Sequence, residues 1–196
     1  MGGDVKQRMI EQTALSLARR GLQRTSFSEV LEASGAPRGS LYHHFPGGKD
    51  ELVAKAVAAA GAFALAHLES LRGQPADKVA AGFIGLWRAL LTRSDFGAGC
   101  AAAAVTVAAE TPDLLRAAAV AFAGWRALLA TLLHEGGVPE KRAQALAATL
   151  IAACEGAVIL ARADHALEPF DLVANEQIAM TKAAIAVPAR NAKRKT

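Results

Sequence analysis

Cysteine, aromatic side chains and long uncharged runs are all scarce in this 196-residue sequence. The two cysteines, Cys100 and Cys154, do not form a metal-binding or disulfide motif, so we expect no metal site and reduced thiols in a cytoplasmic protein. The longest uncharged runs, Phe96–Ala109 and Ala56–Leu68, fall short of the roughly 18 apolar residues that a membrane span needs. No secretory signal is visible at the start. We therefore expect no membrane partner.

The sequence is rich instead in alanine and leucine. Hydrophobic residues make up 53% of it and aromatic residues only 5%, and the near absence of β-branched runs predicts an all-α protein. Capping residues, prolines and glycines divide the chain into about nine helices. The expected helices span about 4–20, 27–34, 37–44, 49–71, 75–92, 100–109, 112–133, 139–163 and 169–186. We expect three parts: a DNA-binding domain (1–48), a sensing and dimerisation domain (49–187) and a disordered basic tail (188–196).

The net charge of +4 does not by itself indicate nucleic acid. Residues 1–55 carry eight Lys/Arg and six Asp/Glu, and residues 56–187 carry ten and twelve. The tail at 188–196 contributes four basic residues and no acid. The overall basicity therefore comes mainly from the tail, and a DNA-binding function has to be argued from local patterns.

Such a pattern lies between residues 25 and 49. Ser26 and Glu29 have the spacing of a capping box, which predicts the start of a short helix ending at Gly35. A helix over Pro37–His44 would then follow a tight turn, giving the helix-turn-helix plan. Eight residues span about 12 Å, which suits a major groove of similar width. Leu41 and Phe45 would seat this third helix on the first two.

The third helix carries the side chains that could contact DNA. Its polar side chains can donate hydrogen bonds to bases or phosphates, its glycine allows close approach of the backbone, and a lysine follows at the start of the next helix. These candidate DNA contacts are Arg38, Gly39, Ser40, Tyr42, His43, His44 and Lys49. Other interpretations stay open. Tyr42 could be a core aromatic, Arg38 an ordinary solvated charge, and His43 with His44 a metal site, although adjacent helical residues point about 100° apart.

The run from Thr25 to Phe45, followed by Lys49–Leu52, resembles the DNA-binding domain of the TetR family. The longer Pro46–Lys49 loop, Gly99–Cys100 before a small-residue helix, and Phe122–Arg126 resemble the LmrA/YxaF-like subgroup. The resemblance implies that phosphates are held by Tyr42, His44 and Lys49, that bases are faced by Arg38, Gly39, Ser40 and His43, and that the DNA backbone is contacted by Thr25 and Ser26. Arg38 is our first candidate for guanine recognition because its planar fork matches both acceptors of that base.

One short recognition helix reads too few base pairs, so we expect a homodimer whose two recognition helices meet successive major grooves about 34 Å apart. The resemblance implies that the last two helices form a four-helix bundle with their copies in the partner. The predicted dimer residues are Leu146, Leu150, Ala153, Gly156, Ala157, Leu160 and Ile178. Alternatively, these stripes pack inside one subunit.

The middle helices would form a sensor domain for a small hydrophobic effector. Large or polar groups scattered among alanines could line its cavity, and the candidates are Phe63, His67, Trp87, Phe96, Cys100, Phe122 and Trp125. Such residues are more often plain core, which is the alternative for each of them. Cys100 could be a redox sensor, but its apolar neighbours favour burial as a small hydrophobe.

These features predict a transcriptional repressor, not an enzyme, that binds a palindromic operator as a dimer and is released by its effector. A ligand-free architectural DNA-binding protein is the alternative. A helical enzyme or carrier using His67 or His134 is disfavoured, because we see no nucleophile with a base, no phosphate loop and no metal cluster in the sequence. No cofactor is expected.

Overall fold

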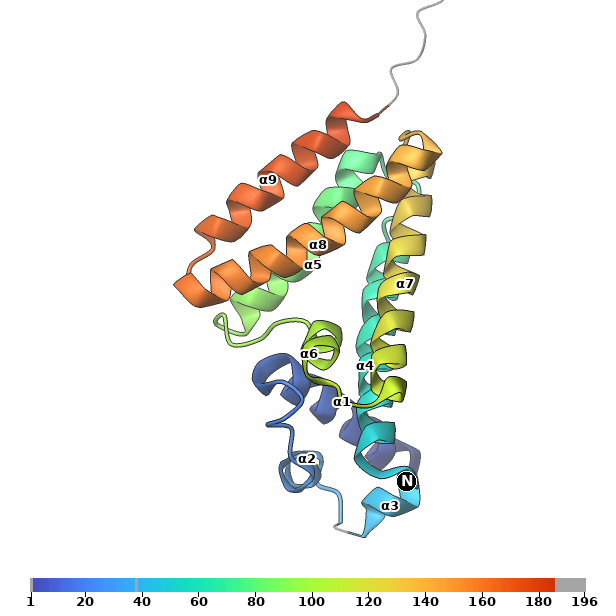
Figure 1. Ribbon diagram of the computed structural model, residues 1–196, viewed down its shortest axis with the longest axis vertical. Coiled ribbons are helices and arrows are strands. Elements are labelled where there is room, and N and C mark those ends of the chain that lie inside the picture. The colour runs from blue at the N-terminus through green and yellow to red at the C-terminus, as the bar shows by residue number, and fades with distance from the viewer. Residues whose placement is uncertain (1, 38, 186–196) are drawn as a thin grey trace, which may run out of the picture.

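The computed structural model describes residues 2–37 and 39–185, which form nine α-helices and no strand. The predicted all-α fold is confirmed. The helices are α1 (Gly2–Arg20), α2 (Phe27–Ser34), α3 (Ser40–His44), α4 (Gly48–Glu69), α5 (Ala76–Arg93), α6 (Ala101–Ala108), α7 (Pro112–Glu135), α8 (Glu140–Asp164) and α9 (Glu168–Ala183). Figure 1 shows α2 and α3 with α1 at one end of the molecule and the longer helices extending away from them.

The N-terminal helix α1 forms because its apolar residues recur with helical spacing. Met9, Thr13 and Leu17 on that stripe are fully buried, and the Thr13 hydroxyl donates to the Met9 carbonyl. Gly21 then takes a positive φ of 77°, which ends the helix as its position predicted. Helix α1 packs against both α2 and α4.

The third helix is shorter than expected. It begins at Ser40 and has five residues, so Pro37 does not open it. Gly39 already has right-handed helical angles, but glycine is a poor helix former and offers no side chain for packing. The helix proper therefore spans about 7.5 Å, and the prediction of an eight-residue helix is wrong.

Close packing of α4 against α7 forms the spine of the larger part, and the two helices lie side by side in Figure 1. A Cβ placed on Gly61 would lie 3.2 Å from the Cβ of Ala121, so small residues let the helices approach. The Trp125 indole Nε1 donates to the Gly61 carbonyl at 3.0 Å. Small side chains and one buried hydrogen bond thus fix this contact.

The remaining long helices complete the bundle. Helix α8 packs against α7 and α9, and α9 packs against α5. A bidentate ion pair joins α5 to α9, with Arg88 Nε 3.0 Å from Asp171 Oδ1. Helix α9 ends at Ala183, three residues before the predicted end. The predicted tail at 188–196 lies outside the described residues.

Three helices, α4, α7 and α8, are long and apolar enough to cross a membrane by length and composition. Uncharged runs alone do not reveal these helices, because a span can carry one or two charged residues and still be apolar on average. The expectation that every apolar segment is too short is therefore wrong for these helices. Each of them buries part of its apolar surface against the other helices.

Two hydrogen bonds tie the segments on either side of α6 to α1 and to α4. The Gly99 amide, just before α6, donates to the Ala18 carbonyl in α1 at 2.8 Å. The Thr111 hydroxyl, at the start of α7, donates to Asp50 Oδ2 in the first turn of α4 at 3.1 Å. The predicted boundary at residue 48 coincides with the first residue of α4 and stays a prediction.

Candidate nucleic-acid interface

Helix α2 begins and ends with the caps that its sequence predicts. The Ser26 hydroxyl accepts from the Glu29 amide, and Gly35 takes a left-handed φ of 64° at the other end. The Gly35 and Ala36 amides donate to the carbonyls of Glu32 and Leu31, so the turn is tightly closed. This turn sends the chain away from α2 toward α3.

Helix α3 is anchored by its apolar residues and presents its polar ones. Leu41 is 3% exposed and Phe45 is fully buried, as predicted, and Tyr42 is 67% exposed. His43 is also exposed, whereas His44 is half-buried between the His43 and Phe45 rings. Tyr42 is therefore not a core aromatic. No cluster of three or more metal-ligating side chains occurs among the described residues, so the histidine pair has no further ligands there.

The start of α4 lies beside Tyr42. Gly48 has a φ of +70°, and a Cβ at that position would lie 3.9 Å from Tyr42 Cε1. The Gly47 amide donates to Glu51 Oε2 at 3.0 Å. Lys49 is half-buried and forms no ion pair with another described residue. Glu51 already binds the Gly47 amide, so the exposed phenol of Tyr42 and the Lys49 ammonium are the groups here that suit an anion such as a phosphate.

Other predicted DNA contacts are placed less favourably or fall outside the description. Thr25 is only 3% exposed as a whole residue, and its hydroxyl donates to the Gly21 carbonyl at 2.8 Å, so the structure does not present it to DNA. Gly39 is exposed, with nothing within 4 Å of where a Cβ would be. Arg38 and the side chain of Ser40 lie outside the described residues.

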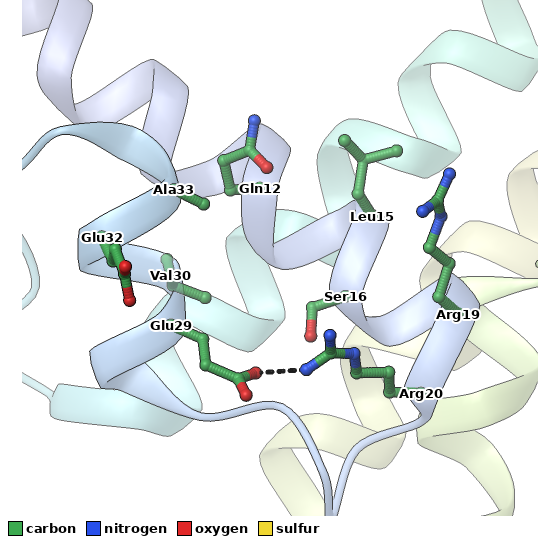
Figure 2. Close-up of a pocket in the computed structure, with 9 residues that line it drawn as sticks. All are labelled: Gln12, Leu15, Ser16, Arg19, Arg20, Glu29, Val30, Glu32 and Ala33. Carbon is green, nitrogen blue, oxygen red and sulfur yellow. Dashed lines mark hydrogen bonds and ion pairs between the residues drawn. The ribbon is translucent and has the colours of Figure 1, made fainter.

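A cleft of about 540 Å³ opens between α1 and α2, which the sequence did not reveal. Figure 2 shows Glu29 of α2 reaching across it to Arg20 of α1, with Glu29 Oε2 2.7 Å from Arg20 Nη1. The cleft is lined by Gln12, Leu15, Ser16, Arg19, Arg20, Glu29, Val30, Glu32 and Ala33. In a full capping box the Glu29 carboxylate would also accept from the Ser26 amide, but it pairs with Arg20 instead, so only the Ser26 half of the predicted box forms among the described residues.

Some of the predicted effector residues form one buried aromatic cluster. Trp87 and Trp125 are 5% and 3% exposed, and their rings meet edge to face at 6.1 Å. The ring centroid of Phe122 lies 5.2 Å from that of Trp125. The ring centroid of Phe83, a residue that we did not predict, lies 6.2 Å from that of Trp87. The Trp87 Nε1 is buried and has no hydrogen-bond partner in the described part of the chain.

The other predicted effector residues are not brought to this cluster. Phe63 is 68% exposed on α4, so its placement in an interior cavity is wrong for this subunit. His67 Nε2 lies 3.0 Å from the Gly82 carbonyl. Phe96, in the loop after α5, packs edge to face against the ring of His165, which follows α8. None of the seven predicted residues lines the second cleft, of about 390 Å³, between α4 and α7.

Cys100 occupies the N-cap of α6 and is 8% exposed. Burial raises the pKa of the Cys100 thiol well above its usual range, and the adjacent Glu155 carboxyl raises it further. Burial also raises the pKa of the Cys154 thiol to about 12. Both thiols are therefore buried small hydrophobes with little thiolate, which opposes a redox-sensor function for Cys100.

Glu155 is a half-buried acid with a buried carboxylate oxygen that our predictions missed. Burial raises the pKa of the Glu155 carboxyl, against a smaller lowering by the Cys100 thiol, and its Oε1 finds no hydrogen-bond partner among the described residues. A sequence signal was present, since Glu155 is the one charged residue between Ala143 and Ala161. An isolated acid in an otherwise apolar helix is expected to be surrounded by apolar groups, and such surroundings raise the pKa of its carboxyl.

The predicted dimer residues divide into two groups. Leu146, Leu150 and Ala157 are at most 2% exposed within one subunit, so their prediction as interface residues is wrong: they fill the core of this subunit. Gly156 and Leu160 lie on the exposed side of α8, whereas Ala153 and, on α9, Ile178 are half-buried. The exposed side of α8 includes Ala145, Ala148, Ala152, Gly156, Ile159, Leu160 and Ala163. These residues are small or apolar, although Thr149 and Arg162 are also exposed on α8, and no other described residue covers them.

A capped support helix, a glycine turn and a short helix with exposed polar groups, attached to a larger helical bundle, define the class of helix-turn-helix transcriptional regulators. Residues 10–56 match the profile of the bacterial regulatory proteins of the tetR family, and residues 75–176 match the transcriptional regulator LmrA/YxaF-like C-terminal domain. The chain belongs to the TetR family, in its LmrA/YxaF-like group.

Individual relatives agree with this assignment. A helix-turn-helix-type transcriptional regulator of Mycobacterium tuberculosis is 40% identical over 176 residues, covering 86% of this chain and 89% of the relative. The regulator YxaF of Bacillus subtilis is 26% identical, covering 89% and 93%. The fold matches a TetR transcriptional regulator from Chloroflexus aurantiacus with a TM-score of 0.78 at 23% identity, covering 94% and 97% of the two chains. The chain is thus a DNA-binding transcriptional regulator.

Proposed function

We propose that this regulator represses transcription by binding a palindromic operator as a homodimer in the cytoplasm, and that a small hydrophobic effector releases it. The observation that carries the proposal is the exposure of Tyr42 and His43 on a helix seated by Leu41 and Phe45, with Tyr42 beside Gly48 at the start of α4. In this proposal Tyr42, His44 and Lys49 hold phosphates and fix the position of α3, and Arg38, Gly39, Ser40 and His43 face bases.

Effector release requires that the effector binds the non-DNA-binding state more tightly than the DNA-binding state. The hydrogen bonds from Gly99 to Ala18 and from Thr111 to Asp50 support such coupling, because they tie α6 and α7 to α1 and α4. The aromatic cluster at Trp87 offers apolar contact and an unpartnered N–H. These features favour a ligand-responsive repressor over a ligand-free architectural protein.

The test is binding of the purified protein to DNA from upstream of its own gene and to scrambled DNA of the same composition. We expect tight binding to an inverted repeat. Arg38→Ala should relax the preference at one position in each half-site, by about 1–3 kcal/mol. Lys49→Ala should weaken binding to all sequences alike and lower the salt slope by about 0.9 per protomer.

Two results would contradict this proposal. Equal affinity for operator and scrambled DNA would favour the architectural alternative. An Arg38→Ala variant with an unchanged base preference would show that Arg38 does not read a base.

A further inference from the structure

Helix α3 is a single turn of five residues, and a helix this short does not hold its own position. Leu41 and Phe45 seat it through apolar contact, but apolar contact is non-directional and leaves its orientation loosely fixed. Reading bases needs side chains held in one orientation. Directional contacts at the two ends of the α2–turn–α3 unit would therefore matter for recognition.

One such contact lies at the end of α2. The Arg8 Nε, in α1, donates to the Ser34 carbonyl at 3.0 Å across 26 residues of sequence. Ser34 is the last residue of α2 and is 3% exposed. A cation at a helix C-terminus interacts favourably with the unpaired carbonyls there. Arg8 Nη1 also pairs with Asp4, so both edges of the guanidinium have partners within the protein.

A second contact lies at the end of α3. The Lys6 Nζ, also in α1, lies 5.5 Å from the centroid of the Phe45 ring, which is cation–π distance. Phe45 is the C-cap of α3, and its amide donates to the Leu41 carbonyl at 2.7 Å. Lys6 and Arg8 are two residues apart and so point about 200° apart around α1. They hold the unit at two separate places.

We propose that Lys6 and Arg8 form a brace that orients α3 for DNA recognition, and that they are positioning residues and not phosphate ligands. Two basic residues near a DNA-binding helix would ordinarily be assigned to phosphates. Here the guanidinium is already shared between Ser34 and Asp4, and the ammonium lies over Phe45. The inference rests on the proposed DNA binding through α3.

The test compares Arg8→Gln, Arg8→Lys and Lys6→Met with Arg19→Gln. Arg19 is a matched control because it lies in the same helix, is exposed and forms no ion pair or hydrogen bond with another described residue. Affinity for the operator and for scrambled DNA is measured by fluorescence anisotropy between 50 and 200 mM salt, at a temperature where circular dichroism finds every variant folded. These concentrations span the range in which phosphate contacts are most visible.

A brace predicts three results. Arg8→Gln weakens operator binding about tenfold, as expected for a lost charge-assisted hydrogen bond, and Lys6→Met about two- to fivefold. Both variants lower the ratio of operator to scrambled affinity and leave the salt slope unchanged relative to Arg19→Gln. Arg8→Lys recovers most of the loss, because an ammonium can still donate to the Ser34 carbonyl.

Other outcomes overturn the inference. A salt slope lower by about 0.9 per protomer, with equal loss on both DNAs, would identify Arg8 as a phosphate ligand. Wild-type affinity in all three variants would remove the brace while the proposed function stands. If the wild-type protein does not bind DNA at all, both the proposed function and the brace are wrong.

Discussion

Substituting Ile159 and Leu160 together by alanine should dissociate the proposed homodimer. Ile159 is 66% exposed and Leu160 51% exposed in one subunit, on the apolar side of α8. Full burial of such a side chain contributes about 1.5–3 kcal/mol. Because each residue occurs twice in a two-fold interface, burying these exposed fractions would contribute roughly 3.5–7 kcal/mol in total. Alanine would retain only a small part of this.

The assay is sedimentation velocity over a concentration series. A loss of 3.5 kcal/mol raises the dimer dissociation constant about 400-fold, so the double variant should be monomeric at micromolar concentrations where the wild-type protein is dimeric. Val120→Ala is the matched control, since Val120 is 68% exposed on α7. A wild-type monomer at micromolar concentration would refute the dimer, and an unchanged dimer in the double variant would refute its placement on α8.

The remaining predictions concern the buried titratable groups. Because burial raises both thiol pKa values, Cys100 and Cys154 should not react with a thiol reagent at pH 8 in the native protein, and both should react in denaturant; fast native labelling would contradict the burial of these residues. Burial also raises the pKa of Glu155, so the folded state holds this proton more tightly than the unfolded state and loses stability as pH rises above the ordinary carboxyl value of about 4.3. Glu155→Gln should therefore be more stable than wild type to urea at pH 7, with the difference disappearing near pH 4. An equal or lower stability of the variant at pH 7 would show that Glu155 is compensated in the core.

Sequence patterns were most informative where a local cause determines local structure. The stop at Gly21, the Ser26 cap and the left-handed Gly35 follow from neighbouring residues alone, and the structure has all three. The burial of Leu41 and Phe45 and the exposure of Tyr42 follow from helical periodicity. The resemblance of residues 25–52 then identified the family.

Predictions failed where a partner distant in sequence decided the outcome. Glu29 has the spacing for a capping box, but Arg20 of α1 lies within 2.7 Å and engages its carboxylate. Leu146 and Leu150 form an apolar stripe that would suit either a dimer interface or a core, and only the packing of α8 against the neighbouring helices assigned them to the core.

The sequence by itself determined the helical class, most helix ends and the position of the candidate DNA-binding helix, because caps, turns and periodicity act within a few residues. Only the tertiary structure decided which apolar side chains remain exposed on α8 and which polar groups are buried near α6. It also placed Lys6 and Arg8 against the ends of α3 and α2. Contacts between residues 26 or more positions apart depend on how the helices pack, and no local pattern specifies that.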